Sequence, residues 1–251
     1  MNPFALPAEI YGAGLVFIRV GAIVMLIPGL GEASVPARIR LGFALLLALC
    51  LAPIAAPTLP AFPTTLGGMG GQVLKEVLVG LMIGALMRLM MSSLAVAGET
   101  VAIQTTLAFS QTANPLGAQP GTSIQTFLTL LGVTLLFATN LHHVFLAAIA
   151  HSYTLFAPSK PIMLQDAASL AIQTVGGSFA LGIQLAAPVI VFSLVFNIAV
   201  GLIGRVMPQF QIFFVASPLS VLLGLSIFAL SLGLIGLVWL SRYEEFLHRF
   251  V

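Results

Sequence analysis

The chain has 251 residues, of which 59% are hydrophobic and only 6% are charged. A soluble domain is roughly a quarter charged, so nine Lys and Arg with seven Asp and Glu are too few to cover a water-soluble globule of this size. The scarcity of charge and the apolar composition exclude a cytosolic enzyme, a nucleic-acid binder and a disordered chain. A net charge of +2 spread over the whole chain also makes no basic patch. The composition predicts an integral membrane protein.

Six apolar runs follow one another along the chain, and each predicts a helical segment because a bilayer core takes about 20 mostly apolar residues per helix. The runs are residues 10–27, 41–56, 73–91 (continuing toward Gln104), 124–150, 179–203 and 210–240. The second run is short for a spanning helix, and Pro218 is expected to break the last one. We therefore expect an all-α integral membrane protein of about six helical segments, in one domain that covers residues 1–251.

Proline and glycine residues are expected to separate these runs. The stretch 57–71 holds three prolines and four glycines, which predict a long loop between the second and third runs. The stretch 107–123 is polar and rich in helix breakers, in an otherwise apolar chain. At 205–208 a proline predicts an abrupt helix end, because the residue before a proline is pushed out of helical geometry.

Charged side chains also occur where a lipid-facing helix would not carry them. The five residues inside or just beyond apolar runs are Arg19, Lys75, Glu76, Arg88 and Glu99. A charge at a helix centre costs roughly 2.5–3.5 kcal/mol on insertion scales, so these groups should face protein, water or the edge of the bilayer. Arg19 lies in the middle of its run and is expected to face other helices or a wet lumen. For Lys75 and Arg88, a long side chain that snorkels to the interface is an equally good explanation.

Glycine spacing and amide side chains predict contacts between helices. Gly80 and Gly84 form a GxxxG motif, and Gly201 forms a second close pair with Gly204, at spacings that let helix backbones approach closely. Asn197 lies inside an apolar run, where its amide needs a hydrogen-bond partner on another helix.

No arrangement of residues predicts catalysis or cofactor binding. Adjacent His142 and His143 point about 100° apart on a helix, and the nearest carboxylate, Asp166, lies across a proline-containing loop, so a metal site is not expected. The sequence contains no HExxH motif and no phosphate-binding loop. We expect a protein that is not an enzyme and that holds no metal and no cofactor.

Three groups of motifs, in this order, resemble the FliR family of flagellar export-gate proteins, whose injectisome counterparts are called SctT. The first group covers residues 17–21, 28–31 and 35–40, and the second covers 75–84, 97–99 and 114–115. The third and most specific covers 188–197, 201–205, 208–213 and Pro218. The form of the segment after Pro208 is typical of flagellar members more than of injectisome members.

The resemblance implies a subunit of the flagellar type III protein export gate, made of helical hairpins that need not cross the bilayer as their hydropathy suggests. Members of the family join FliP-like and FliQ-like subunits in a closed helical assembly with FlhB-like and FlhA-like neighbours. The assembly lies in the bacterial cytoplasmic (inner) membrane at the flagellar basal body. It forms the entry for unfolded flagellar axial proteins, and the energy for their export would come from elsewhere.

Two sets of site residues follow from the motifs and the resemblance. The resemblance implies a loop that plugs the closed pore at residues 107–123 of this chain, and a plain surface loop is the alternative. The plug residues are Leu107, Phe109, Gln111, Asn114, Pro115, Leu116 and Gly117. The residues for helix packing and assembly are Arg19, Gly80, Gly84, Glu99, Asn197, Gly201, Arg205 and Pro208.

Three alternatives remain open from the sequence. The first is the corresponding subunit of an injectisome export gate. The second is a secondary transporter of small solutes, which also has broken helices and charges at mid-membrane depth, but which predicts a repeated pattern in the two halves that this sequence does not show. The third is an intramembrane enzyme, whose turnover would depend on one or two of the histidine or acidic residues.

Overall fold

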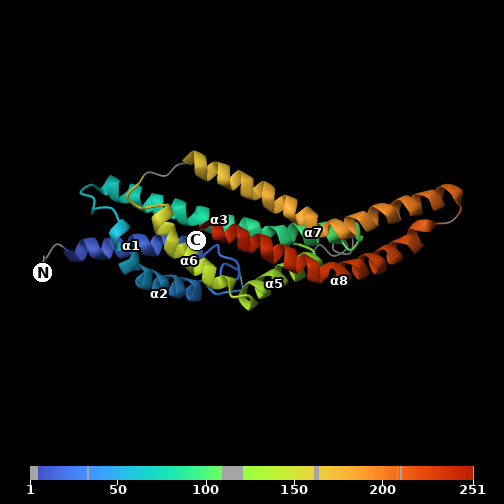
Figure 1. Ribbon diagram of the computed structural model, residues 1–251, viewed down its shortest axis with the longest axis horizontal. Coiled ribbons are helices and arrows are strands. Elements are labelled where there is room, and N and C mark those ends of the chain that lie inside the picture. The colour runs from blue at the N-terminus through green and yellow to red at the C-terminus, as the bar shows by residue number, and fades with distance from the viewer. Residues whose placement is uncertain are drawn as a thin grey trace. The chain divides into compact units, whose positions relative to one another are not determined.

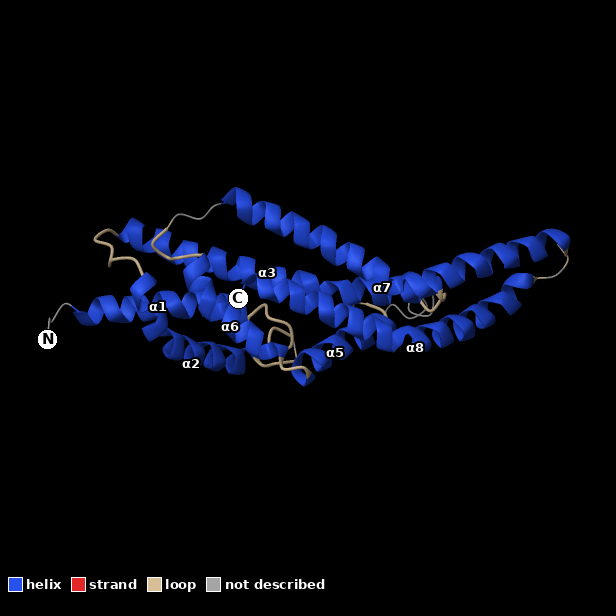
Figure 2. Cartoon of the chain, in the orientation of Figure 1, coloured by secondary structure: helices blue, strands red, loops and turns tan. Residues whose placement is uncertain are grey.

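The computed structural model describes residues 5–32, 34–108, 121–160, 164–207, 209 and 211–250. Throughout these ranges the regular structure is helical, with no strand (Figure 2). The helices, labelled in Figure 1, are α1 (Ala5–Val24), α2 (Ala37–Ala55), α3 (Leu66–Gln104), α5 (Ser123–Ala138), α6 (Leu141–Leu155), α7 (Leu164–Val206) and α8 (Ile212–Leu247). Two short 3₁₀ turns, η1 (Ala56–Thr58) and η3 (His248–Phe250), follow α2 and α8.

The all-α membrane fold is confirmed. Four stretches of the described helices are long and apolar enough to cross a membrane: Ala37–Thr58, Leu66–Gln104, Gln165–Val206 and Phe214–Phe250. A fifth is added if α5 and α6 are counted as one broken span. The predicted number of six segments is therefore approximate.

The loop predicted over residues 57–71 is much shorter, because α3 already begins at Leu66. The prediction was wrong for four glycines that lie in the first turns of this helix: Gly67, Gly68, Gly70 and Gly71. The hydroxyl oxygen of Thr65 accepts a hydrogen bond from the backbone N–H of Gly68 at 3.2 Å and caps the helix just before Leu66. Each glycine costs about 1 kcal/mol relative to alanine, which the continuous apolar helix beyond them outweighs.

Two further boundaries differ from the expected ones, and one agrees. The run 124–150 is not one helix, because it is interrupted between α5 and α6 at Asn140, whose φ of 60° is left-handed. Pro218 does not break the last run, since it lies inside α8. A proline there removes one backbone hydrogen bond near the helix start, and helices in a membrane protein tolerate such a loss. The helix end predicted at 205–208 is confirmed, because α7 ends at Val206.

The chain divides into two compact units. Unit 1 comprises Met1–Met90, Thr139–Val175 and Glu244–Val251. Helices α1 and α2 pack against each other there, and the core is built from Val16, Val20 and Ile23 of α1 with Val79 and Ile83 of α3. Whether the chain acts as one functional domain stays a prediction.

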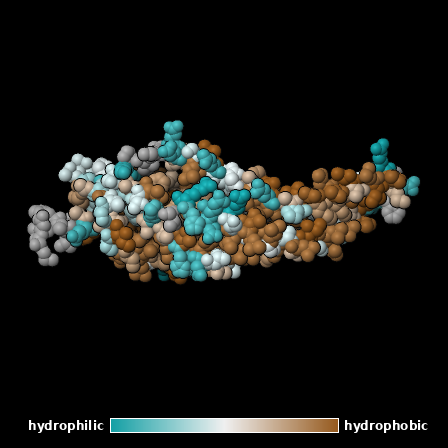
Figure 3. All heavy atoms as spheres, viewed as in Figure 1, coloured by the Kyte–Doolittle hydropathy of each residue, from teal (hydrophilic) through white to brown (hydrophobic). Residues whose placement is uncertain are grey.

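Unit 2 comprises Met91–Ala138 and Gly176–Tyr243. Leu94, Leu128 and Trp239 are fully buried in it, and the rings of Trp239 and Tyr243 pack with their centroids 5.0 Å apart. By contrast, only 17% of the most apolar stretch of α7, and likewise of α8, is buried. Figure 3 shows the hydrophobic surface that results along these two helices. A surface this apolar is not suited to water and needs lipid or another protein to cover it.

Candidate functional site

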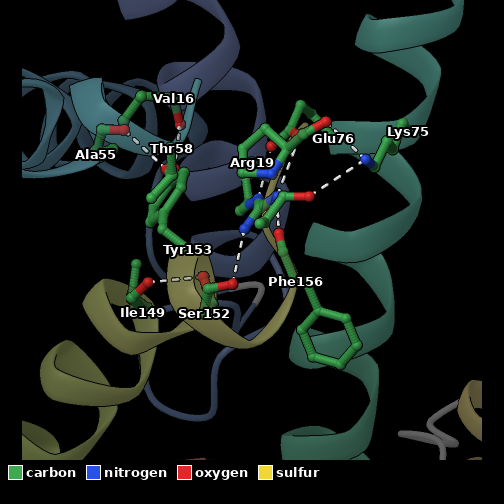
Figure 4. Close-up of polar contacts among 12 residues, drawn as sticks. Val16, Arg19, Ala55, Thr58, Lys75, Glu76, Ile149, Ser152, Tyr153 and Phe156 are labelled. Atoms are coloured by element: carbon green, nitrogen blue, oxygen red, sulfur yellow. Dashed lines mark hydrogen bonds and ion pairs between the residues drawn. The ribbon is translucent and has the colours of Figure 1, made fainter. Parts of the chain in front are cut away.

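Arg19 of α1 and Glu76 of α3 form a buried ion pair in unit 1 (Figure 4). The Arg19 Nε atom donates to Glu76 Oε2 at 2.6 Å, and Nη2 donates to Glu76 Oε1 at 3.1 Å. This two-point geometry is the strong form of an arginine–carboxylate contact. The side chains are 0% and 1% exposed, so each charge depends on the other for its stabilisation.

The remaining donors of Arg19 bind the C-terminal end of α6. Nη1 donates to the carbonyl oxygen of Ser152 at 2.9 Å, and Nη2 also donates to that of Phe156 at 2.8 Å. The Ser152 carbonyl oxygen also accepts the backbone N–H of Phe156 at 2.9 Å, and both carbonyls lie at the negative end of the helix dipole, where a cation is favourable. Figure 4 shows the guanidinium between these two carbonyls and Glu76.

Tyr153 completes the surroundings of Arg19. Its ring centroid lies 4.4 Å from Arg19 Cζ, which is within the range of a cation–π contact. Its hydroxyl group donates to the carbonyl oxygen of Val16 at 3.3 Å, so the same residue also ties α6 to α1. Arg19 thereby holds three helices, α1, α3 and α6, at one point.

Lys75, the residue before Glu76 in α3, binds backbone carbonyls just beyond those that Arg19 binds. Its Nζ atom donates to the carbonyl oxygen of Pro158 at 2.6 Å, to that of Ala157 at 3.3 Å, and to that of Lys160. The end of α6 and the turn after it are thus held by two cations from neighbouring helices. We call Arg19, Lys75, Glu76, Ser152, Tyr153 and Phe156 the arginine clamp.

Two glycines allow α1 and α3 to come this close. A Cβ atom added to Gly80 would lie 2.7 Å from both the Arg19 carbonyl oxygen and the Ala22 Cβ atom. A Cβ atom added to Gly84 would lie 3.2 Å from the Ile23 carbonyl oxygen of α1 and 2.8 Å from the Cβ atom of Leu26, just after that helix. Real side chains do not approach backbone this closely, so the GxxxG motif packs α3 on α1 of the same chain.

The other assembly candidates do not join the clamp. Asn197, Gly201 and Arg205 are exposed on the apolar surface of α7, and a Cβ atom added to Gly201 would meet nothing within 4 Å. Glu99 lies in α3 within unit 2, where its Oε2 atom is buried without a hydrogen-bond partner among the described residues. Pro208 lies outside the described residues.

Most of the plug candidates also lie outside the described residues, namely Phe109, Gln111, Asn114, Pro115, Leu116 and Gly117. Leu107, which is half-buried, is the one plug candidate within them. Before the segment, Gln104 Oε1 accepts a hydrogen bond from the Ser193 hydroxyl of α7 at 2.7 Å. After it, Thr122 and Gln125 form a capping box, in which each side-chain oxygen accepts the backbone N–H of the other.

The two ends of this segment are also packed together directly. A Cβ atom added to Gly98 of α3 would lie 2.4 Å from the Cα atom of Gln125 in α5. Only glycine fits at this crossing, so the end of α3 and the start of α5 are held in backbone contact. The described residues on either side of positions 109–120 therefore belong to a firmly packed pair of helices.

The sequence predicted that Arg19 faces other helices or a wet lumen, and the structure shows the first of these, but the pairing with Glu76 and the contributions of Ser152, Tyr153 and Phe156 were missed. Only the presence of opposite charges in two separate apolar runs hinted at the pair. For Lys75, the contacts are with protein carbonyls, whereas Arg88 is exposed. Within the described ranges, no three His, Cys, Asp or Glu residues are grouped so that they could hold a metal ion.

The helices and their apolar surfaces define an all-α membrane protein. Residues 10–246 match the family described as bacterial export proteins, family 1. The chain is similar to the flagellar biosynthetic protein FliR of Caulobacter vibrioides, with 59% identity over 250 residues and 100% of each chain covered. It is 31% identical to the protein of the same name from Pectobacterium carotovorum and 29% identical to that of Escherichia coli, with 87% of this chain and 83% of each relative covered. The chain therefore belongs to the FliR family of bacterial export proteins.

Proposed function

We propose that this chain is a subunit of the flagellar type III protein export gate and that it forms, with FliP-like and FliQ-like subunits, the membrane entry for unfolded flagellar axial proteins. The observation that carries the proposal is the 59% identity, over the full length of both chains, to a flagellar biosynthetic protein FliR. The gate would lie in the bacterial cytoplasmic membrane at the flagellar basal body, with FlhB-like and FlhA-like neighbours. In this role the chain acts as a channel component without catalysis.

The surface of unit 2 supports an assembly role. Most of the apolar surface of α7 and α8 is uncovered within the chain, and Asn197 and Arg205 lie on that surface of α7. An exposed amide in an apolar surface requires a hydrogen-bond partner, which a neighbouring subunit can supply and lipid cannot. We therefore assign this part of α7 to contacts with the FliP-like and FliQ-like subunits.

The segment 109–120 is the proposed seal of the resting gate. Its two ends are fixed by the Gly98–Gln125 crossing, the Thr122–Gln125 capping box and the Gln104–Ser193 hydrogen bond. A plug must stay attached to rigid helices while its middle blocks the path, and these contacts supply the attachment. Leu107 and the other plug candidates would then fill the closed entry.

The proposal is tested by genetic replacement in a Caulobacter strain that lacks its own FliR. The chain is expected to restore swimming and filament growth, and a purified tagged version is expected to carry FliP and FliQ with it. A photo-crosslinking residue at Asn197 should link to one of these subunits, whereas one at the buried Leu94 should not. If the chain reaches the membrane in normal amount but restores no swimming and carries neither subunit, the proposed function is overturned.

A further inference from the structure

Helix α3 carries a row of side chains that the described part of the chain leaves uncovered. Much of the remaining helix circumference is packed within unit 1, because Gly80 and Gly84 contact α1, and Val79 and Ile83 are buried. The uncovered row has three leucines that are 59%, 49% and 42% exposed, followed by a half-buried alanine and an exposed arginine. In chain order these residues are Leu74, Leu78, Leu81, Ala85 and Arg88. We call them the leucine–arginine stripe.

The spacing of the stripe is that of a contact between two helices. Its members are four, three, four and three residues apart, which is the heptad spacing that keeps one side of a helix facing a partner. At about 100° per residue they cover an arc of roughly 80°. One neighbouring helix covers an arc of this width, whereas a surface that faces lipid needs no such regular spacing. The stripe is therefore suited to one further helix.

Arg88, at the end of the stripe, lies at a depth where lipid headgroups do not reach it. It is the one charged residue between Glu76 and Glu99 in the sequence of α3. Along the helix it is about 18 Å from the first of these and about 16 Å from the second. An arginine side chain is shorter than either distance, so Arg88 cannot snorkel to an end of this apolar stretch. Because α3 is long and apolar enough to cross a membrane, an unpaired charge at this point is costly.

No residue in the described part of the chain neutralises Arg88. Its side chain is exposed, and none of the hydrogen bonds or ion pairs among the described residues involves it. Water is an unsuitable neighbour, because the rest of the stripe is apolar. A carboxylate is suitable, since it can accept two hydrogen bonds from the guanidinium group and offsets its charge. The pair of Arg19 with Glu76 is an example of this solution on the same helix.

We propose that the leucine–arginine stripe binds a membrane helix of a neighbouring subunit and that this helix carries an aspartate or glutamate opposite Arg88. Apolar side chains of the partner helix pack between Leu74, Leu78 and Leu81, and the carboxylate neutralises the guanidinium group. The charge pair fixes the register of the two helices, because a shift by one turn, about 5.4 Å, would separate two charges in an apolar contact. The stripe lies on a different helix from the proposed contacts of α7, and the inference does not depend on the export role.

A photo-crosslinking residue at Leu81 tests what covers the stripe. The full chain is expressed in the Caulobacter strain that lacks its own FliR, and the cross-linked peptide is sequenced by mass spectrometry. We expect an apolar helix of another protein with an Asp or Glu about seven positions from the cross-linked residue, since Leu81 and Arg88 are about two turns apart. The same residue placed at Leu46, which is exposed on α2, should not link to this helix. Cross-linking to lipid alone, to a second copy of the chain, or to a helix without an acid near that position overturns the proposal.

The charge pair is tested by exchange of its two members. Arg88→Glu brings like charges together, so co-purification of the identified partner should fall at least about tenfold. Replacement of the partner's acid by arginine should restore at least half of it in the Arg88→Glu background. Arg38→Glu reverses another exposed charge, in the first turn of α2, and should leave co-purification unchanged.

Two results of the exchange would overturn the proposal: unchanged co-purification in Arg88→Glu, or no recovery in the exchanged pair. The amount and the elution volume of each variant in detergent show whether it folds, and the cross-link at Leu81 decides the question in the unchanged chain if Arg88→Glu does not fold. Swimming and the cross-link at Asn197 test the proposed function separately, so either conclusion can fail while the other stands.

Discussion

Arg19 and Glu76 are 57 positions apart in the chain, yet Arg19 Nε lies 2.6 Å from Glu76 Oε2 and the two charges neutralise each other. Both side chains have almost no contact with solvent. Such a pair contributes little net stability compared with well-packed apolar residues, because both ions must be removed from water. Loss of one partner is different, since the other charge is then buried alone. The pair therefore makes the fold of unit 1 sensitive to single substitutions at either position.

The first prediction follows from this sensitivity. Glu76→Gln should destabilise the chain by roughly 3–5 kcal/mol, seen as a lower melting temperature in detergent and a lower yield of folded protein. Glu244→Gln, at a half-exposed carboxylate, is the matched control and should have almost no effect. The double variant R19M/E76M removes both charges and should recover most of the loss. A melting temperature of Glu76→Gln equal to that of the unchanged chain would contradict the clamp.

The second prediction concerns the crossing of α1 and α3. Gly80→Leu places a side chain where a Cβ atom alone would already lie 2.7 Å from the Arg19 carbonyl oxygen, so it should cost roughly 1–3 kcal/mol or more. It should also reduce co-purification with FliP-like partners, because unit 1 is distorted. Gly201→Leu makes the same change where nothing lies within 4 Å, and its melting temperature should be nearly unchanged. Equal stability of the two variants would argue against the close helix contact.

The third prediction addresses the proposed plug. Replacement of residues 109–120 by a glycine-serine linker of the same length should raise ion leak through the assembled gate, measured as conductance in planar bilayers. The fixed ends at Gly98, Thr122 and Gln125 are retained, so the gate should still assemble. Equal-length glycine-serine replacement of residues 59–64, which keeps the Thr65 cap of α3, serves as the control and should leave conductance at its resting value. Unchanged conductance in the first variant would remove the plug assignment.

The fourth prediction tests the hydrogen bond between α3 and α7. Ser193→Ala removes the donor to Gln104 Oε1 and should cost about 0.6 kcal/mol, and at most about 1.7 kcal/mol, as for other hydrogen bonds between membrane helices. Ser226→Ala is the matched control, because among the described residues that exposed hydroxyl bonds to the Leu222 carbonyl of its own helix and not to another helix. Thermal unfolding followed by circular dichroism should give a lower melting temperature for Ser193→Ala than for Ser226→Ala. A larger loss in Ser226→Ala would contradict the assignment.

The helical class could be predicted because long apolar runs can be recognised directly in the sequence. Each of these runs forms helix in the described part of the chain. The boundaries were less predictable, since they depend on single side chains. Thr65 starts α3 ahead of a glycine-rich stretch that favours a loop, and Asn140 ends a run that hydropathy treats as continuous. Pro218 does not break α8 as the sequence predicted, because the lost hydrogen bond lies near the start of a long helix.

The candidate site, too, could be predicted only in part from the sequence, as the arginine clamp shows. That Arg19 turns toward protein follows from the cost of a charge in lipid, and sequence alone contains that information. Its partners come from α3 and from backbone carbonyls of α6, more than 50 and 130 positions away. Backbone carbonyls carry no residue signature, so nothing in the sequence marks Ser152 or Phe156 as ligands. Such contacts become visible only when the helices are placed in space.

The turn after α6 is held by two side chains that belong to other helices, Arg19 of α1 and Lys75 of α3. Arg19 reaches the carbonyls of Ser152 and Phe156, and Lys75 reaches those of Ala157, Pro158 and Lys160. One extra residue inserted after Phe156 would move the carbonyls that Lys75 contacts out of its reach. The carbonyls that Arg19 contacts would stay in place. The length of the turn after Phe156 is therefore tied to the positions of two cations on other helices, and insertions there should be tolerated less well than in a segment without such contacts.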